Sequence, residues 1–276
     1  PSIGVITNIG IDHLSGCRTL DNYILAKGEM LTALGDKGTL IINNDDENIK
    51  KLDFSVFKGK IVTFGIRNKS DIYADNIKFK DGEIHFVLNN KYYVKVPGLG
   101  IHNVYNALAA LSVLNELKID IHEAIKGLEK YQPMKSHFEI IRGINNSIIV
   151  DDTWSSNPTS VKAALETMHL VKGTKVLVIG YISYLGDHAL AQAKEIGKMV
   201  VKYKIDYLVT IDNFSKHIGL EAIRQGMDES RVFQCQNEDE LNSVLYHLLE
   251  PNVYVLFKTS MFDRKIGSII NKVMLK

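Results

Sequence analysis

The sequence predicts an α/β protein, and three observations support this class. In the second half, short apolar runs alternate with longer segments of helical spacing, which is typical of a mostly parallel sheet with helical crossovers. In the first half, apolar strand runs precede a stretch in which apolar and polar residues alternate. The 276 residues, 45% of them hydrophobic and 24% charged, are enough for two domains with buried cores.

The first third of the chain mixes strands and one long helix. Ile3–Ile9 reads as a buried strand, and Thr19–Leu34 has apolar residues at helical spacing before two glycines. Thr39–Asn43 and Ile61–Phe64 are further strands. Between them, residues 44–47 predict a polar turn and the start of a helix.

Residues 71–96 predict a small antiparallel sheet. The alternating segments Ile72–Lys80, Glu83–Leu88 and Tyr92–Val96 are separated by Asp81-Gly82 and Asn89-Asn90, which favour tight hairpin turns. We expect this sheet to be appended to the parallel one.

Two helices and a linker follow. His102–Leu117 and Ile121–Tyr131 have amphipathic spacing, and Gln132-Pro133 interrupts it. We therefore predict a domain of residues 1–133 and a second domain of residues 134–276.

The second half alternates strands and helices. Strands are expected at Phe138–Ile141, Ile148–Asp152, Lys175–Ile179, Tyr207–Ile211, Val232–Cys235 and Asn252–Lys258, and helices at Pro158–Met168, Ala189–Tyr203, Ser215–Gln225, Asn237–Leu249 and Arg264–Met274. Right-handed crossovers then give a Rossmann-like domain. Residues 180–186 follow a strand without a GxGxxG pattern, which argues against NAD binding.

Composition excludes several classes of function. The net charge is +1, from 33 basic and 32 acidic residues, so nothing indicates a nucleic-acid surface. Cys17 and Cys235 lack metal-site spacing, which favours free thiols in a cytosolic protein. No apolar run reaches membrane-spanning length. The sequence does not indicate an oligomeric state.

Two candidate residues lie near the beginning of the chain. His13 follows the first strand in a turn with Asn8 and Asp12, and it is either a core histidine bonded to a carbonyl or a magnesium ligand. Asp12 is equally well a helix cap. Lys27 lies on the predicted helix, where a lone lysine is normally solvated.

Further candidates have side chains that suit a nucleoside. Asn103 and Asn106 are three residues apart on one helical face, and an amide matches the donor and acceptor edge of adenine. For Asn103, helix capping is the alternative. Asp152 ends a strand, where it can accept both ribose hydroxyls. Trp154 either packs on the ribose or belongs to an inter-domain core.

Five stretches of sequence together resemble the Mur ligases, the ATP-dependent amide-bond-forming enzymes of peptidoglycan synthesis. Residues 6–14 read ITNIGIDHL and residues 26–29 read AKGE. Residues 100–110 read GIHNVYNALAA, close to a GxHNxxNALAA pattern. DDTWSSNPTS at 151–160 and KTS at 258–260 correspond to DDSYNANPxS and KGS. The resemblance is greatest to the branch that adds D-alanyl-D-alanine to the UDP-muramoyl tripeptide.

This resemblance implies a fold, ligands and site residues. It implies part of a central ATPase domain, with a mixed parallel sheet and a small antiparallel one, followed by a Rossmann-like C-terminal domain. It implies ATP and Mg²⁺, an acyl-phosphate intermediate, a small-molecule or UDP-linked peptide substrate, and a cytoplasmic location. The implied roles are metal binding and catalysis for His13 and Lys27, with Lys27 as a carbamate, nucleotide binding for Asn103, Asn106, His137, Asp152 and Trp154, and substrate binding for Lys258 and Ser260.

The sequence also departs from the family pattern. It contains no GxxGKT or GxxGKS loop, which in this family cradles the ATP phosphates. We therefore expect the C-terminal part of a longer protein, inactive by itself. His137 replaces an arginine, and an altered acceptor pocket is indicated by four further positions: Tyr181, Tyr184, Ala193 and Met261. The alternatives are a Mur-type ligase for another acceptor, such as polyglutamate or a specialised metabolite, and a non-catalytic Mur-like binding protein.

Overall fold

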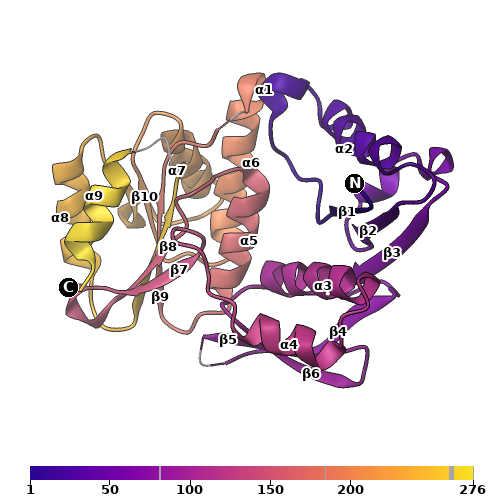
Figure 1. Ribbon diagram of the computed structural model, residues 1–276. Coiled ribbons are helices and arrows are strands. Elements are labelled where there is room, and N and C mark those ends of the chain that lie inside the picture. Colours follow the sequence, from indigo (N-terminus) through magenta and orange to yellow (C-terminus); the bar gives the residue numbers. More distant parts are fainter. Residues whose placement is uncertain (81, 184, 261–263, 276) are drawn as a thin grey trace. The chain divides into compact units, whose positions relative to one another are not determined.

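The computed structural model describes residues 1–80, 82–183, 185–260 and 264–275 (Figure 1). The chain forms two compact units. Unit 1 comprises residues 1–10 and 17–132, and unit 2 comprises residues 11–16 and 133–276. Residues 11–16 thus belong to unit 2, although they precede most of unit 1 in the sequence.

Unit 1 is built on a mixed sheet with the strand order β1-β2-β3-β4-β5-β6. Its strands are β1 (Ile3–Ile6), β2 (Thr39–Asn43), β3 (Lys60–Gly65), β4 (Ile72–Lys80), β5 (Glu83–Leu88) and β6 (Tyr92–Pro97). Neighbours from β1 to β4 are parallel, and β4, β5 and β6 are antiparallel. The predicted antiparallel extension of a parallel sheet is confirmed.

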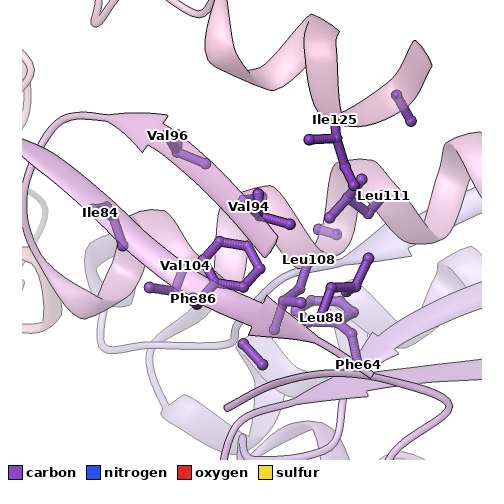
Figure 2. Close-up of a cluster of buried hydrophobic side chains, with 14 of the residues drawn as sticks. Phe64, Ile84, Phe86, Leu88, Val94, Val96, Val104, Leu108, Leu111 and Ile125 are labelled. Atoms are coloured by element: carbon purple, nitrogen blue, oxygen red, sulfur yellow. The ribbon is translucent and has the colours of Figure 1, made fainter. Parts of the chain in front are cut away.

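The helices of unit 1 are α2 (Leu20–Leu34), α3 (Ile101–Glu116) and α4 (Ile121–Glu129). The short α1 (Leu14–Cys17) has residues 14–16 in unit 2 and only its last residue, Cys17, in unit 1. Between the sheet and the helices α3 and α4 lies an apolar core. Both the strands and the helices contribute side chains to it, as Figure 2 shows for Phe64 and Phe86 of the sheet and Leu108 and Leu111 of α3. Burial of these side chains holds α3 against the sheet.

The helix start predicted at residues 44–47 is a turn followed by one 3₁₀ turn, η1 (Ile49–Lys51). The cause is local: the Asp46 carboxylate accepts hydrogen bonds from the N–H groups of Asn48 and Ile49, and from Ile9 on the neighbouring segment. An aspartate that binds the backbone in this way favours a turn over a longer helix.

Unit 2 has a six-stranded sheet with the order β11-β10-β9-β12-β8-β7, in which only β7 is antiparallel to its neighbour. The strands are β7 (Glu139–Arg142), β8 (Ile148–Asp151), β9 (Thr174–Ile179), β10 (Tyr207–Thr210), β11 (Val232–Gln234) and β12 (Val253–Lys258). The helices are α5 (Pro158–His169), α6 (Ala189–Lys202), α7 (Ser215–Arg224), α8 (Glu238–Leu248) and α9 (Arg264–Val273).

The helices of unit 2 cover both faces of its sheet. The helices α5, α6 and α7 pack side by side, and α8 and α9 lie together on the other side of the strands (Figure 1). The central strands are accordingly buried on both faces and consist of continuous apolar runs, as parallel sheets require. The α/β class and the Rossmann-like organisation of the second half are confirmed.

Within the described ranges, the helices are too short or too polar to cross a membrane. Cys17 and Cys235 are both free, as predicted.

Candidate active site

Polar residues collect at the carboxyl ends of three neighbouring strands of unit 2. The strand β12 lies between β8 and β9, whereas β9, β10 and β11 follow one another outward. The chain therefore reverses its direction across the sheet when it returns to β12. Ligands of open parallel sheets bind outside the carboxyl ends of strands at such a reversal.

Lys258, the last residue of β12, is only 1% exposed. Its Nζ lies 2.8 Å from Asp152 Oδ2 and donates to the Ser155 carbonyl at 2.7 Å. Burial lowers the pKa of Lys258, and the Asp152 carboxylate acts in the opposite direction. A buried ammonium is tolerated when it is paired and hydrogen bonded in this way.

Asp152 follows β8 directly. Its N–H donates to the carbonyl of Phe257 at 3.0 Å, which extends the β8–β12 pairing by one residue. Its Oδ1 accepts a hydrogen bond of 3.2 Å from the N–H of Phe138. The carboxylate is therefore held from two sides, and because an ionised carboxylate has about four acceptor sites, it retains capacity for a ligand.

A stacked aromatic pair includes the exposed Trp154, which is two residues from Asp152 in the sequence, and the partly exposed His137. The Trp154 ring stacks on the His137 ring, with centroids 5.4 Å apart and planes inclined by 28°. The backbone N–H of Trp154 donates to the Ser136 carbonyl at 3.1 Å. Trp154 is 49% exposed, so the pair offers a flat surface of the kind on which a sugar or base packs.

Buried hydroxyl groups continue this edge of the sheet. Ser183 donates to Ser260 at 3.0 Å, and both residues are buried. Among the described residues, Thr259 Oγ1 and Ser156 Oγ have no hydrogen-bond partner. A Cβ at Gly180 would lie 2.9 Å from Thr259 Oγ1, so the glycine leaves space for the threonine hydroxyl.

The segment 11–16 is hydrogen bonded to the N-terminus of α5. Asn157 caps this helix through a bond from the N–H of Ser160, and its Nδ2 donates to Asp12 Oδ2 at 3.2 Å. The N–H of Ile11 donates to Thr159 Oγ1 at 2.9 Å. These contacts explain why the segment belongs to unit 2.

His13 lies in this segment with a φ of 52° and a side chain that is 55% exposed. The alternative of a buried core histidine is therefore wrong. Its Nε2 is 3.9 Å from Asp12 Oδ2, and Asp12 Oδ1 accepts from the His13 N–H. No three metal-binding side chains gather within the described part of the chain. Because Mg²⁺ commonly takes one or two protein ligands and completes its shell with phosphate oxygens and water, His13 and Asp12 fit a partial set.

In unit 1, the two asparagines of α3 contact each other. Asn106 Nδ2 donates to Asn103 Oδ1 at 3.2 Å, and Asn103 Nδ2 donates to the Leu99 carbonyl at 2.8 Å. The helix begins at Ile101 after Gly100, whose φ is 91°. The capping alternative for Asn103 is therefore wrong, and the chain of bonds fixes the Asn106 amide on an exposed face.

Sequence reasoning missed the residue that anchors this helix. Tyr105 Oη donates to Asp45 Oδ2 at 2.9 Å, and Asp45 also accepts from the N–H groups of Ile66, Arg67 and Asn68. One feature of the sequence pointed to Asp45: it is an acidic residue in the polar run directly after a buried strand. Functional groups often lie at the carboxyl ends of parallel strands.

Lys27 is exposed on α2, and its Nζ lies 5.0 Å from the centroid of the Tyr23 ring. This is the distance of a cation–π contact. Lys27 belongs to unit 1 and His13 to unit 2.

The positions that depart from the family pattern differ in their surroundings. Tyr181 is 49% exposed, whereas Ala193 is completely buried within α6. A histidine at position 193 would have to enter the packed interior, which explains the small side chain there. Tyr184 and Met261 lie outside the described residues.

Comparison with known proteins places both units in one family. The Mur ligase middle domain matches residues 1–114, and the Mur ligase glutamate ligase domain matches residues 138–261.

Individual relatives are similar over nearly the whole chain. The UDP-N-acetylmuramoyl-tripeptide–D-alanyl-D-alanine ligase of Buchnera aphidicola is 28% identical over 99% of this chain, which spans 59% of that relative's length. The crystal structure of MurF from Acinetobacter baumannii is 27% identical with a TM-score of 0.88, covering 100% of this chain and 60% of that one. MurF of Thermotoga maritima, solved with ADP, has a TM-score of 0.85 at 18% identity, over 99% of this chain and 62% of that one, which shows the shared fold.

Proposed function

Because the chain belongs to the Mur ligase family, we propose that it is part of an ATP-dependent ligase that forms an amide bond in peptidoglycan precursor synthesis. The D-alanyl-D-alanine ligases are the relatives that support this choice. Since the chain spans 59% of the length of one such relative, the activity of the whole protein is part of the proposal.

The observation that carries the proposal is the carboxylate of Asp152 at the reversal point of the unit 2 sheet. It is fixed by Lys258 and by the N–H of Phe138, and the exposed Trp154 is two residues away. A carboxylate that retains acceptor sites beside an aromatic surface suits the two hydroxyls and the flat face of a ribose. His137, stacked on Trp154, completes this surface.

The adenine would contact the amide of Asn106 in unit 1. One N–H of the Asn106 amide is donated to Asn103, and its second N–H and its Oδ1 supply the donor and acceptor that match the N7 and N6 positions of adenine. Asn103 already accepts from Asn106 and donates to Leu99, so it orients Asn106 and has less capacity for the base.

In the proposed reaction, the substrate carboxylate attacks the γ-phosphorus of ATP and ADP leaves. The neutral amine of the acceptor then attacks the carbonyl carbon of the acyl phosphate. The C–O bond to the phosphate breaks as phosphate leaves the tetrahedral intermediate, and the nitrogen loses its extra proton to solvent to give the amide. Bound Mg²⁺ would neutralise phosphate charge. His13, with Asp12 beside it, and Lys27, as a carbamate, are the proposed metal-binding groups, and Ser260 is proposed to face the acceptor.

A second candidate function is a Mur-type ligase with another acceptor. Two residues that depart from the family pattern at the proposed acceptor pocket favour it. Tyr181 presents a large exposed ring where the family pattern has an acid, and Ala193 is buried where it has a histidine. These changes alter the hydrogen-bonding groups offered to an incoming amine. The chemistry at the nucleotide would be the same.

The test is phosphate release by the native gene product with ATP, Mg²⁺ and UDP-muramoyl tripeptide, with and without D-alanyl-D-alanine, with the product identified by mass. Release that depends on the dipeptide supports the first candidate, and release that depends on a different amine supports the second. Asp152→Asn should weaken ADP binding, whereas Asp206→Asn, at the Lys175 ion pair in the same unit, should not. If nucleotide binds but no acceptor supports turnover, a non-catalytic binding protein is the correct interpretation.

A further inference from the structure

The side chain of Lys258 is enclosed by protein atoms. It is 1% exposed, and its ammonium has three oxygen neighbours: Asp152 Oδ2 at 2.8 Å, the Ser155 carbonyl at 2.7 Å and the Asp152 carbonyl at 3.4 Å. An ammonium has three N–H donors. All of them are thus directed at the segment 152–155 that follows β8, which leaves no donor for an acceptor substrate.

Stability by itself does not account for this arrangement. A buried ion pair often contributes less to folding than apolar side chains of the same volume, because both charges lose their hydration. What the pair does provide is position: Lys258 extends from β12 and fixes the first residues after the neighbouring strand β8. The carboxylate of Asp152 is thereby held between Lys258 and the N–H of Phe138.

The segment that Lys258 holds also carries the exposed tryptophan. The N–H of Trp154 donates to Ser136, and the carbonyl of Ser155 accepts from Lys258. The backbone is therefore fixed on both sides of Trp154. Loss of the Lys258 ammonium would release Asp152 and Ser155 together and would leave the carboxylate with a single protein partner.

We propose that Lys258 is a positioning residue for the nucleotide, which acts by directing the Asp152 carboxylate and the segment 152–155 toward the ribose. This inference rests on the proposed function, and it replaces the expected contact between Lys258 and the acceptor. It assigns specificity for the ribose hydroxyls to a residue that does not touch the ribose.

The experiment compares ADP with 2′,3′-dideoxy-ADP by calorimetric titration of the native gene product. The wild type should prefer ADP by about tenfold or more, since each of the two lost hydrogen bonds to a charged group can contribute about that factor. Lys258→Met should lose most of this preference while its affinity for the dideoxy nucleotide stays within about twofold. Lys175→Met, which breaks another Lys–Asp pair of unit 2, is the control and should keep the preference.

A double-mutant cycle separates positioning from a general loss of structure. If Lys258 acts through Asp152, Asp152→Asn with Lys258→Met should bind ADP as weakly as Asp152→Asn alone. If Lys258→Met does not fold, Lys258→Gln, which keeps two N–H donors without the charge, takes its place in the cycle. Additive losses, or a raised KM for the acceptor with unchanged ribose preference, would overturn the inference. A wild type that does not bind ADP at all would instead contradict the proposed function.

Discussion

The hydroxyl of Tyr105 donates a 2.9 Å hydrogen bond to Asp45 Oδ2 and so ties the N-terminal half of α3 to the turn that follows β2. Burial alone would raise the pKa of Asp45, but the N–H groups of Ile66, Arg67 and Asn68, together with the Tyr105 hydroxyl, lower it below its usual value. Burial, and then the Asp45 carboxylate, raise the pKa of Tyr105. Asp45 is therefore a charged centre on which three segments of unit 1 depend.

We predict that Asp45→Asn destabilises unit 1 at neutral pH and reduces its acid sensitivity. A carboxylate whose folded pKa is depressed stabilises the fold above its unfolded pKa of about 4, and this contribution is lost as the pH falls through the folded value. At pH 7 the variant should lose on the order of 1–3 kcal/mol of unfolding free energy. Urea unfolding between pH 7 and pH 3 should show a shallower pH dependence than in wild type.

Two controls accompany this variant. Tyr105→Phe removes one hydrogen bond and keeps the carboxylate, so it should cost about 1 kcal/mol and retain the acid dependence. Asp53→Asn removes an exposed aspartate whose carboxylate, among the described residues, accepts hydrogen bonds from the nearby Ser55, and it should have little effect on the free energy of unfolding. The same pH dependence in Asp45→Asn and wild type would contradict the assignment.

For the nucleotide, we predict that Asn106→Ala weakens ATP binding more than Asn103→Ala does. Asn106 would contact the base, and a lost bidentate base contact costs about 1–3 kcal/mol. Asn103 acts through Asn106 and Leu99, so its loss should have a smaller effect on affinity. Titration calorimetry measures the ATP affinity of both variants. If both bind ATP as tightly as the wild type, the adenine site is rejected.

Much of the fold was predictable from sequence because strands and helices here have clear periodicity. The buried strands β2, β9 and β12 are continuous apolar runs, and the hairpin β4–β6 alternates with turn residues between its strands. The burial of Lys258 was not predictable, since lysine is almost never fully buried unless it is paired. Its partner Asp152 is 106 residues away, and only the tertiary fold brings the two together.

The segment 11–16 shows a different limit of sequence analysis. Nothing in its composition indicates that it packs with a domain more than a hundred residues away. Its attachment depends on hydrogen bonds from the Ile11 N–H to Thr159 and from Asn157 to Asp12. Polar contacts of this kind leave no periodic pattern in a sequence.

We predict that Asn157→Ala loosens this segment as well as α5. Loss of the cap should lower the unfolding free energy by about 1 kcal/mol, and the Ile11 amide should exchange with solvent faster. Asn237→Ala is the matched control, because Asn237 caps α8 in the same way without contact to residues 11–16. If Ile11 exchanges equally fast in both variants, Asn157 does not hold the segment.

We predict that Lys27→Ala abolishes ATP-dependent ligation by the native gene product, with a loss on the order of 100-fold or more in kcat. If a carbamate on Lys27 is required, Lys27→Arg should be equally inactive, and short-chain carboxylates should restore part of the activity of Lys27→Ala. The exposed Lys126 on α4 provides a control alanine variant with normal turnover. Unimpaired turnover by Lys27→Ala would reject the carbamate.

The last prediction concerns nucleotide binding by the 276 residues alone. They contain the proposed adenosine contacts, Asn106 and Asp152, but no GKT or GKS loop, whose backbone N–H groups would bind the phosphates. Adenosine and ATP should therefore bind with nearly equal affinity, no better than about 1 mM, which corresponds to about −4 kcal/mol. Titration of both ligands under the same salt conditions measures this, and Asn106→Ala should weaken both equally. Micromolar binding of ATP with a clear preference over adenosine would show that a phosphate site exists within these residues.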